Sequence, residues 1–498
     1  TDQHGQRARR HDARAHGEHD AVKAGRAQHV AAIRAQIVHA QGDQPPRGPH
    51  PYIALGLGLM AQGHTVTIVT HEEYKEWVVR FGIGHRTAGG DPGALMKLSV
   101  ENKMFTPQFF REGITHFRSW FDDLLQDAWK QTQDADVLLE SPSAMAGVHI
   151  AEALRKCSVD LPCALSLNFF IGIPYFRTFT MPWSKTHDFP HAFLSPPVDS
   201  PTFNIASYVL FDNVMWAATS GQINRWRKSV LQIGVTDMGH LAQSKIPFIY
   251  NFSQAVVPRP LDWDDATTIS GYWFLDNPDQ DWKAPQSLLD WMDKARKDQK
   301  PIVYIGFGSI VVPDPTRVTK NIIQGVLKSE WAFGFSGKFL ADVGGAGGVR
   351  AIISKGWSSR MEKASDEELI TFPEETYSLD KVPHDWLFPQ IDAVLHHGGA
   401  GTTGASLRAG LPTLIRPWFG DQFFWASRVQ KLGAGLKVSS LRVNELSEAL
   451  TRATTDRIMK EKAAVVGERI RRETGVQNAI QAIYTYMPRA ARDRTTIE

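Results

Sequence analysis

Short apolar runs alternate with helical patterns along most of the chain. The segment YIALGLGLMAQGH (52–64) predicts a helix that ends near Gly63, and the β-branched run TVTIVT (65–70) predicts a strand. Residues 72–81 then show the pattern of another helix. Strands that alternate with helices in this way indicate a parallel sheet with helices on both faces.

The same alternation continues to about residue 420. DVLLES (136–141) predicts a short buried strand, residues 144–154 predict a helix, and IPYFRTFTMPW (173–183) predicts a further strand. Four more strand-then-loop units follow, at KPIVYIGFGSI (300–310), RAIISKGW (350–357), DAVLHHGG (392–399) and PTLIRPWFG (412–420). We therefore predict an α/β fold of two Rossmann-like, doubly wound domains that face each other across a cleft.

Changes in composition suggest where these domains begin and end. The first fifty residues are rich in Arg, His, Ala and Gln, so we expect them to be disordered or wrongly derived from the gene. The polar, proline-bearing DNPDQDWKAPQ (276–286) is the best linker candidate. The predicted parts are an N-terminal segment 1–50, a first domain 51–275, a linker 276–299, a second domain 300–470, and a C-terminal helix and tail 471–498.

Composition narrows the class of protein. A net charge of +2 gives no reason to expect a nucleic acid partner. The two cysteines, Cys157 and Cys163, build no disulfide framework and suit a reducing compartment. No run of about 18 apolar residues predicts a membrane-spanning helix, and the polar N-terminus has no signal-peptide core. We expect a cytoplasmic protein that contacts a membrane surface transiently.

The most informative motif is HHGGAGTTGASLRAGLPTLIRPWFGDQ (396–422), which begins at the end of a predicted strand. Open parallel sheets bind ligands at that end. Three glycines allow a backbone to approach a bulky anion, namely Gly398, Gly399 and Gly401. Thr402 or Thr403 is expected to cap the following helix, whose N–H groups would face a phosphate, with His397 adding a hydrogen bond or partial charge.

Part of the motif also fits the dinucleotide fingerprint G-x-G-x-x-G, through Gly399, Gly401 and Gly404. That fingerprint requires an acidic residue at the tip of the next strand, where it binds a ribose. Here the next strand continues into a loop before Asp421 appears. Asp421 and Gln422 together offer acceptors and donors, which suits sugar hydroxyls.

The motif as a whole resembles the C-terminal nucleotide-sugar signature of fungal sterol glucosyltransferases. Further similarity covers most of residues 51–440, in PHDWLFP (383–389), FFWASRV (423–429), ENKMFTPQFF (101–110), ESPSAMAGVHIAEAL (140–154), FTMPW (179–183), YVLFDNVMWAATSGQINRWRK (208–228) and GYWFLD (271–276). The resemblance implies the GT-B fold, with a first domain for the acceptor and a second for the UDP-sugar. It implies transfer of glucose from UDP-glucose to the 3-hydroxyl of a sterol such as ergosterol, with inversion and with no metal or other cofactor.

The resemblance also assigns residues. The diphosphate is expected at Ser309 and along His397, Gly398, Gly399, Ala400, Gly401, Thr402 and Thr403. Trp386 is expected beside the uracil, with an ordinary core aromatic as the alternative, and Asp421 and Gln422 beside the glucose hydroxyls. The sterol is expected among the aromatics between Phe105 and Trp226, which fit either a core or a large apolar cavity.

The catalytic base is where the sequence departs from the family. The family has a loop close to GSRGDVQPY, whose Asp takes the proton from the acceptor, but Gly48 occupies that position here. Asp43 and His50 are the two nearby candidates. Two segments, about 157–171 and 330–347, also interrupt the resemblance. We interpret them, with residues 1–50, as products of an imperfect gene model, such as retained intron sequence.

Two other functions remain open at this point. The altered N-terminal segment is compatible with a catalytically impaired relative that still binds a UDP-sugar or a sterol. The glycine pattern is compatible with an NAD-dependent oxidoreductase. Asp134 and Asp136 fit the D-x-D of metal-dependent glycosyltransferases, but they begin a predicted strand instead of ending it, so we assign them no metal role.

Overall fold

The structure is a computed structural model. It describes residues 33–38, 50–89, 120–157, 170–194, 200–243, 246–276, 282–308, 312, 314–335, 348–354 and 370–490. Of the predicted site residues, Asp43 and Ser309 lie outside these ranges. Most of the two segments that interrupt the resemblance lies outside them as well.

The first lobe is built around a sheet of seven parallel strands in the order β3-β2-β1-β4-β7-β8-β9. Its strands are β1 (Arg34–Val38), β2 (Thr65–Thr70), β3 (Gly84–Thr87), β4 (Val137–Glu140), β7 (Tyr175–Phe179), β8 (Phe248–Tyr250) and β9 (Thr267–Ile269). Its helices are α2 (His50–Ala61), η1 (Glu72–Tyr74), α3 (Lys75–Val79), η2 (Pro142–Ala144), α6 (Gly147–Ala153), α7 (Pro201–Trp226), η3 (Arg227–Leu231) and α8 (Met238–Gln243). A separate antiparallel pair joins β5 (Arg155–Cys157) to β6 (Phe170–Gly172).

The second lobe has a sheet of six parallel strands in the order β12-β11-β10-β13-β14-β15. Its strands are β10 (Ile302–Gly306), β11 (Arg350–Ser354), β12 (Thr376–Leu379), β13 (Ala393–His396), β14 (Thr413–Ile415) and β15 (Gly435–Lys437). Its helices are α9 (Gln286–Lys297), α10 (Pro315–Phe335), α11 (His384–Leu387), η5 (Phe388–Gln390), α12 (Ala400–Arg408), α13 (Gln422–Leu432), α14 (Val443–Thr455) and α15 (Arg457–Arg471), followed by α16 (Gly475–Ala490).

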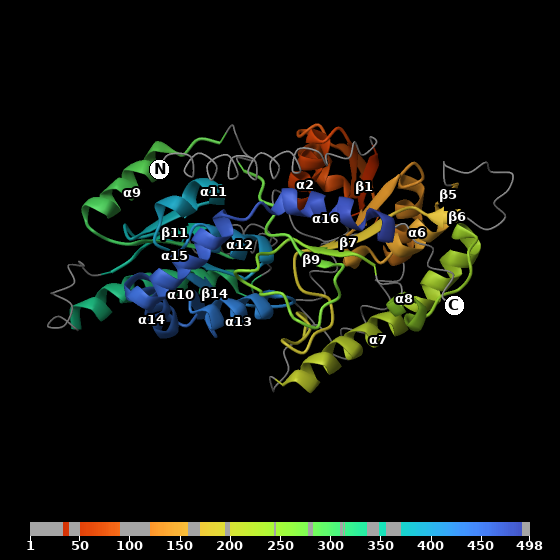
Figure 1. The fold of residues 1–498 in the computed structure, drawn as a ribbon. Coiled ribbons are helices and arrows are strands. Elements are labelled where there is room, and N and C mark those ends of the chain that lie inside the picture. Colours follow the sequence, from red (N-terminus) through yellow and green to blue (C-terminus); the bar gives the residue numbers. More distant parts are fainter. Residues whose placement is uncertain are drawn as a thin grey trace, which may run out of the picture.

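Helices cover both faces of each sheet, as Figure 1 shows. In the first lobe, one face packs against α2 and α16, and the other packs against α6, α7 and the helical stretch 120–131. In the second lobe, α10 and α14 cover one face, while α9 and α11 cover the other. Strands buried on both faces need continuous apolar runs, and β10 is accordingly buried at all five positions. The prediction of two doubly wound parallel sheets is confirmed.

Most predicted elements occur close to the expected residues. The helix predicted over 52–64 is α2, and the strand predicted over 65–70 is β2. The helix predicted over 72–81 is a 3₁₀ turn followed by the short α3. Helix α9 begins within the predicted linker and packs its Leu288 and Met292 into the core of the second lobe.

β1 corrects the prediction for the N-terminal segment. The sequence predicted no strand within residues 1–50, yet Arg34–Val38 lies in the centre of the first sheet, between β2 and β4. Ile37 is fully buried and lies opposite Ile68 and Leu139 in the register of the two neighbouring strands. The first lobe therefore has the central strand that its topology requires.

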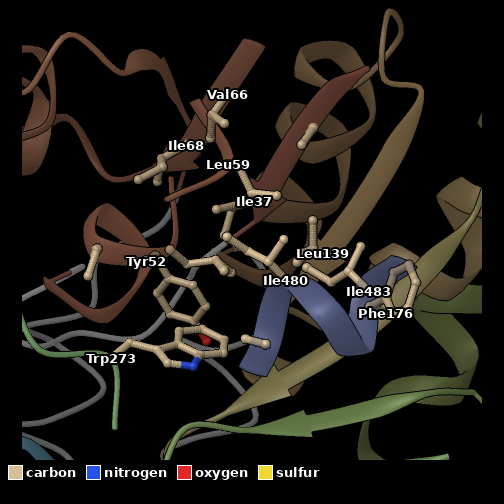
Figure 2. Packing of buried hydrophobic residues seen from close by; sticks show 14 of the residues in the cluster. Ile37, Tyr52, Leu59, Val66, Ile68, Leu139, Phe176, Trp273, Ile480 and Ile483 are labelled. Atoms are coloured by element: carbon tan, nitrogen blue, oxygen red, sulfur yellow. The ribbon is translucent and has the colours of Figure 1, made fainter. Parts of the chain in front are cut away.

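α16 returns from the second lobe to the first. It lies beside α2 in Figure 1, and Figure 2 shows its Ile480 and Ile483 packed with Tyr52, Leu139 and Phe176. The C-terminal helix therefore completes one face of the first sheet. No helix in the described ranges combines the length and the apolar character needed to cross a bilayer.

Candidate functional site

The candidate site lies at the carboxyl end of β13 in the second sheet. The chain order reverses between β10 and β13, which makes this the topological switch point of the lobe. Ligands of doubly wound sheets bind outside the strand ends at such a point. The loop 397–399 connects β13 to α12, and the loop 416–421 connects β14 to α13 at the same edge.

Gly398 makes the turn from β13 into α12 possible. Its φ is +97°, a region that residues with a side chain rarely adopt. A Cβ at this position would lie 2.6 Å from Cγ2 of Ile415 and 3.2 Å from the carbonyl oxygen of Gln422. Nδ1 of the buried His396 accepts a 2.9 Å hydrogen bond from the Gly398 amide and fixes the turn. Both loops of the site are therefore packed against each other at Gly398.

The first turn of α12 begins without a side-chain cap. Gly399 is the N-cap residue, with φ −61° and ψ 142°, and no side chain caps the helix. The expectation that Thr402 or Thr403 caps it was wrong. Both threonines lie inside the helix, and the Thr403 hydroxyl donates a 2.9 Å hydrogen bond to the carbonyl oxygen of Gly399.

The uncapped start of α12 suits an anion. The first N–H groups of a helix have no partner within it, and the helix dipole places positive potential there. Gly401 lies in this turn, is exposed, and has no atom within 4 Å of the position that a Cβ would take. The geometry thus brings together the residues 397–403 that the sequence predicted, around open backbone amides.

His397 lies against the same turn. Its Nε2 is 2.5 Å from the position that a Cβ on Gly399 would take. The side chain of His397 is half-buried. This close approach explains why residue 399 has no side chain.

Asp421 and Gln422 begin α13 next to this turn, and both side chains are held by the protein. Nε1 of Trp425 donates a 2.8 Å hydrogen bond to Oδ2 of Asp421. Burial raises the pKa of the Asp421 carboxyl to about 6, against the lowering effect of that hydrogen bond. Oε1 of the buried Gln422 accepts from the backbone amides of Trp418 at 2.8 Å and Phe419 at 3.3 Å. Gln422 therefore shapes the loop that precedes Asp421.

Sequence reasoning missed a cation at this edge, Arg416. Its backbone amide donates a 2.9 Å hydrogen bond to the carbonyl oxygen of His396, so it lies beside the end of β13. The guanidinium is 5.0 Å from the ring of Trp418, and burial lowers its pKa from the usual value. The signal was present in the sequence as the charged end of the predicted strand PTLIR.

Trp386 lies on α11, which packs beside α12. It is half-buried, and its ring centroid is 4.9 Å from that of Trp282. On the same short helix, His384 stacks on Phe388 at 4.3 Å and has its ring 5.3 Å from Tyr304. An aromatic surface therefore borders α12, and the role of Trp386 beside a base stays a prediction.

Of the two residues predicted for proton transfer, the structure describes His50. His50 begins α2 and stacks on Trp77, with ring centroids 5.1 Å apart. Asp43 follows the last residue of β1, Val38, by five positions and lies outside the described residues. The choice between Asp43 and His50 stays a prediction.

Glu140 is the last residue of β4, at the carboxyl ends of the strands of the first sheet. Its buried carboxylate accepts hydrogen bonds from the amides of Ala146 at 2.8 Å and Gly147 at 2.6 Å, and from the Tyr175 hydroxyl. Burial raises the pKa of this carboxyl. The Glu140 carboxylate therefore holds the loop 141–146 in place through these backbone amides instead of facing a ligand.

The D-x-D pair forms ion pairs at the opposite end of β4. Asp134 binds Arg86, with oxygen–nitrogen distances of 2.6 and 2.8 Å, and Asp136 binds Arg34 at 3.1 Å. The guanidinium of Arg86 holds the pKa of the Asp134 carboxyl below its usual range. These carboxylates connect β1 and β3 to β4.

Comparison with known proteins gives two family matches. A family model described as the glycosyltransferase family 28 N-terminal domain matches residues 50–157. A second one, described as the erythromycin biosynthesis protein CIII-like C-terminal domain, matches residues 359–481. The two matches fall in the first and second lobes.

Curated relatives match nearly the whole chain. A sterol 3-beta-glucosyltransferase of Yarrowia lipolytica is 49% identical over 87% of this chain, and one of Aspergillus fumigatus is 49% identical over 89%. The alignments cover 28% and 30% of those relatives, so the chain spans less than a third of their length. The chain is similar to one part of these longer proteins.

A solved structure shares the fold. The calicheamicin glycosyltransferase CalG4 matches with a TM-score of 0.61 at 16% identity, over 93% of this chain and all of that protein. The predicted GT-B fold is confirmed.

Proposed function

We propose a reaction for this chain, which belongs to the glycosyltransferase family of the fungal sterol 3-beta-glucosyltransferases. The chain transfers glucose from UDP-glucose to the 3-hydroxyl of a membrane sterol. The product is a steryl β-glucoside, formed with inversion. The observation that carries this proposal is the uncapped first turn of α12 beside Asp421.

The donor half of the proposal rests on the second lobe. The diphosphate binds the amides at the start of α12, with His397 beside it and Arg416 near the end of β13. Asp421 accepts hydrogen bonds from glucose hydroxyls, and Gln422 keeps the loop before it in place. The aromatic surface of α11 then serves the uracil, with Trp386 as the candidate contact.

The chemical step needs a leaving-group site and a base. The sterol oxygen attacks the anomeric carbon while the bond from that carbon to the diphosphate oxygen breaks, and UDP leaves. Backbone amides and the helix dipole stabilise the charge that develops on the diphosphate, so the proposed reaction uses no metal or other cofactor. A group in the segment that follows β1 in the chain, Asp43 or His50, takes the hydroxyl proton.

The location of the acceptor in the cell determines where the enzyme has to act. Sterols such as ergosterol reside in membranes, so we propose a cytoplasmic protein that contacts a membrane surface transiently to reach its substrate.

A catalytically impaired relative that binds a UDP-sugar or sterol is the second candidate function, because Gly48 stands where the family has its base. The NAD-dependent alternative loses support, because the relatives and the N-terminal family model reported above are those of glycosyltransferases.

The test is incubation of this polypeptide with UDP-glucose and ergosterol, followed by mass detection of steryl glucoside. Steryl glucoside is expected, together with release of UDP. UDP binding without product would favour the impaired relative. Protection against thermal unfolding by NAD but not by UDP would overturn the proposal.

A further inference from the structure

A cluster of five aromatic rings lies where the first lobe meets the second. It consists of Trp183, His191 and Phe193 from the loop after β7, and Tyr208 and Phe211 from α7. His191 is at its centre, stacked on Phe211 with centroids 3.9 Å apart. Its ring also lies 5.1 Å from Trp183, 5.2 Å from Tyr208 and 5.7 Å from Phe193.

The cluster reaches the candidate donor site through Phe193. The ring of Phe193 is 3.5 Å from the position that a Cβ on Gly420 would take, and Gly420 precedes Asp421 directly. Trp183 and Phe193 are half-buried, whereas His191 and Tyr208 are each 1% exposed. The cluster is thus buried at His191 and Tyr208 and packs, through Phe193, beside the loop that carries Asp421.

The protonation state of His191 follows from its contacts. Nδ1 accepts a 3.3 Å hydrogen bond from the amide of Phe193, so the ring proton of the neutral form is on Nε2. Burial lowers the pKa of His191 to about 3, which keeps the ring neutral. His191 therefore presents a fixed Nε2–H donor.

Two buried polar atoms of the cluster have no hydrogen-bond partner in the described part of the chain. They are Nε2 of His191 and the hydroxyl of Tyr208, which belong to neighbouring rings. Buried polar groups are normally paired, and an unpaired one is destabilising. Two such unpaired polar atoms within one aromatic surface fit a ligand that has apolar rings and one polar oxygen.

We propose that His191 Nε2–H and the Tyr208 hydroxyl bind the hydroxyl oxygen of the acceptor, while Trp183, Phe193 and Phe211 contact its apolar rings. This inference rests on the proposed function, and it names the part of the first lobe that recognises the alcohol. The acceptor oxygen accepts a hydrogen bond from Nε2–H and keeps a second lone pair for attack on the sugar, while the Tyr208 hydroxyl accepts a hydrogen bond from the acceptor O–H until the base takes that proton. Because Nε2 already carries its proton, His191 binds the acceptor and does not serve as the base.

The test measures the affinity of the protein for two probes in detergent micelles. One probe is dehydroergosterol, a fluorescent sterol, and the other is its 3-deoxy analogue. Wild-type protein is expected to bind the sterol about tenfold more tightly than the deoxy compound, the effect of one or two hydrogen bonds in a buried site. Tyr208→Phe and His191→Phe, which keep a ring in place, are each expected to show a smaller preference for the sterol than wild type, and the double variant is expected to bind both compounds equally. Tyr272→Phe is the matched control, since it also removes a buried tyrosine hydroxyl that lacks a partner in the described ranges. It should keep the wild-type preference.

Unchanged UDP affinity shows that a variant is folded. If His191→Phe does not fold, the affinities of Tyr208→Phe for the two probes test the inference. The inference is overturned if Tyr208→Phe retains the wild-type preference for the hydroxyl. It is also overturned if wild-type protein binds neither probe or does not distinguish them. Selective sterol binding without formation of steryl glucoside would instead contradict the proposed function and leave this site in place.

Discussion

Nε1 of Trp425 donates a 2.8 Å hydrogen bond to Oδ2 of Asp421, which joins the first turn of α13 to the residue that precedes it. The indole is fully buried, so the carboxylate is held in one orientation at the start of a helix. Burial raises the pKa of Asp421 to about 6, and the hydrogen bond from Trp425 partly opposes that rise. The proposed sugar-binding carboxylate therefore titrates close to neutral pH.

This titration predicts a pH limit on donor use. The ionised carboxylate accepts stronger hydrogen bonds from sugar hydroxyls than the protonated carboxyl does, so kcat/KM for UDP-glucose should fall as the pH drops through about 6. Trp425→Phe removes a hydrogen bond to the ionised form, so the acid limb should move to higher pH. The measurement is kcat/KM between about pH 5 and 8. Asp421→Asn, which has no carboxyl group to titrate at this position, is the control and should not show this limb. An acid limb that stays in place in Trp425→Phe would contradict the assignment.

Asp421→Asn separates stability from activity. The folded-state pKa of Asp421 is raised, so its ionisation lowers stability as the pH rises from the usual carboxyl pKa through about 6. Asp421→Asn should therefore unfold at the same or a higher temperature than wild type at pH 7, when no ligand is bound. Its kcat/KM should fall roughly tenfold to a hundredfold, the effect of losing a hydrogen bond to a charged group. Thermal unfolding and initial rates measure the two effects. A variant that loses stability and activity together would point to a purely structural role.

The sequence predicted the second lobe better than the first, and the reasons are local. The run 396–422 carries its own signals, because an apolar strand, a glycine turn and a helix follow one another directly. β1 has no such pattern, since Gln36 lies in its middle and is buried. Nε2 of Gln36 donates a 2.7 Å hydrogen bond to Asp134, a partner 98 positions away that no local pattern reveals.

The same limit explains errors of detail in the site. Threonine is a common N-cap residue, and two of them near the start of α12 favoured the wrong cap. The Thr403 hydroxyl bonds backward to Gly399 within the helix instead. Likewise, the sequence shows the aromatics between Phe105 and Trp226, but which rings surround His191 depends on how α7 packs against the loop after β7.

Two glycines of the donor site should respond differently to alanine. Gly398→Ala forces a side chain into a backbone region with φ of +97° and into contact with Ile415, so the second lobe should be destabilised by about 1–3 kcal/mol. Gly401→Ala meets no atom within 4 Å, so its stability should match or exceed that of wild type. It should nonetheless weaken UDP binding, because the new methyl group lies at the open turn. Denaturant unfolding and calorimetric UDP titration measure both variants. Full UDP affinity in Gly401→Ala would place the diphosphate elsewhere.

Asp43→Asn and His50→Gln distinguish the two candidates for the base. Loss of the true base should lower kcat by about 10²–10⁴ and leave UDP affinity unchanged. We expect Asp43 to be the more sensitive position, because the His50 ring stacks on Trp77 while Asp43 follows β1 in the chain. Single-turnover rates with saturating sterol give the comparison. Equal rates for both variants and wild type would exclude both residues as the base.

The return of α16 to the first lobe predicts that the last described helix stabilises the acceptor half. Ile483 is 1% exposed and packs in the same cluster as Tyr52 and Phe176, so Ile483→Ala should lower the free energy of unfolding by about 2–5 kcal/mol. Tyr484→Phe removes only the 2.6 Å hydrogen bond to His64 at the edge of this contact and should cost about 0.5–1.5 kcal/mol. Since the donor loops belong to the other sheet, Ile483→Ala should affect sterol KM before it affects UDP affinity. Urea unfolding and separate titrations of the two substrates test this order. Loss of UDP affinity ahead of sterol KM would mean that α16 acts on the second lobe.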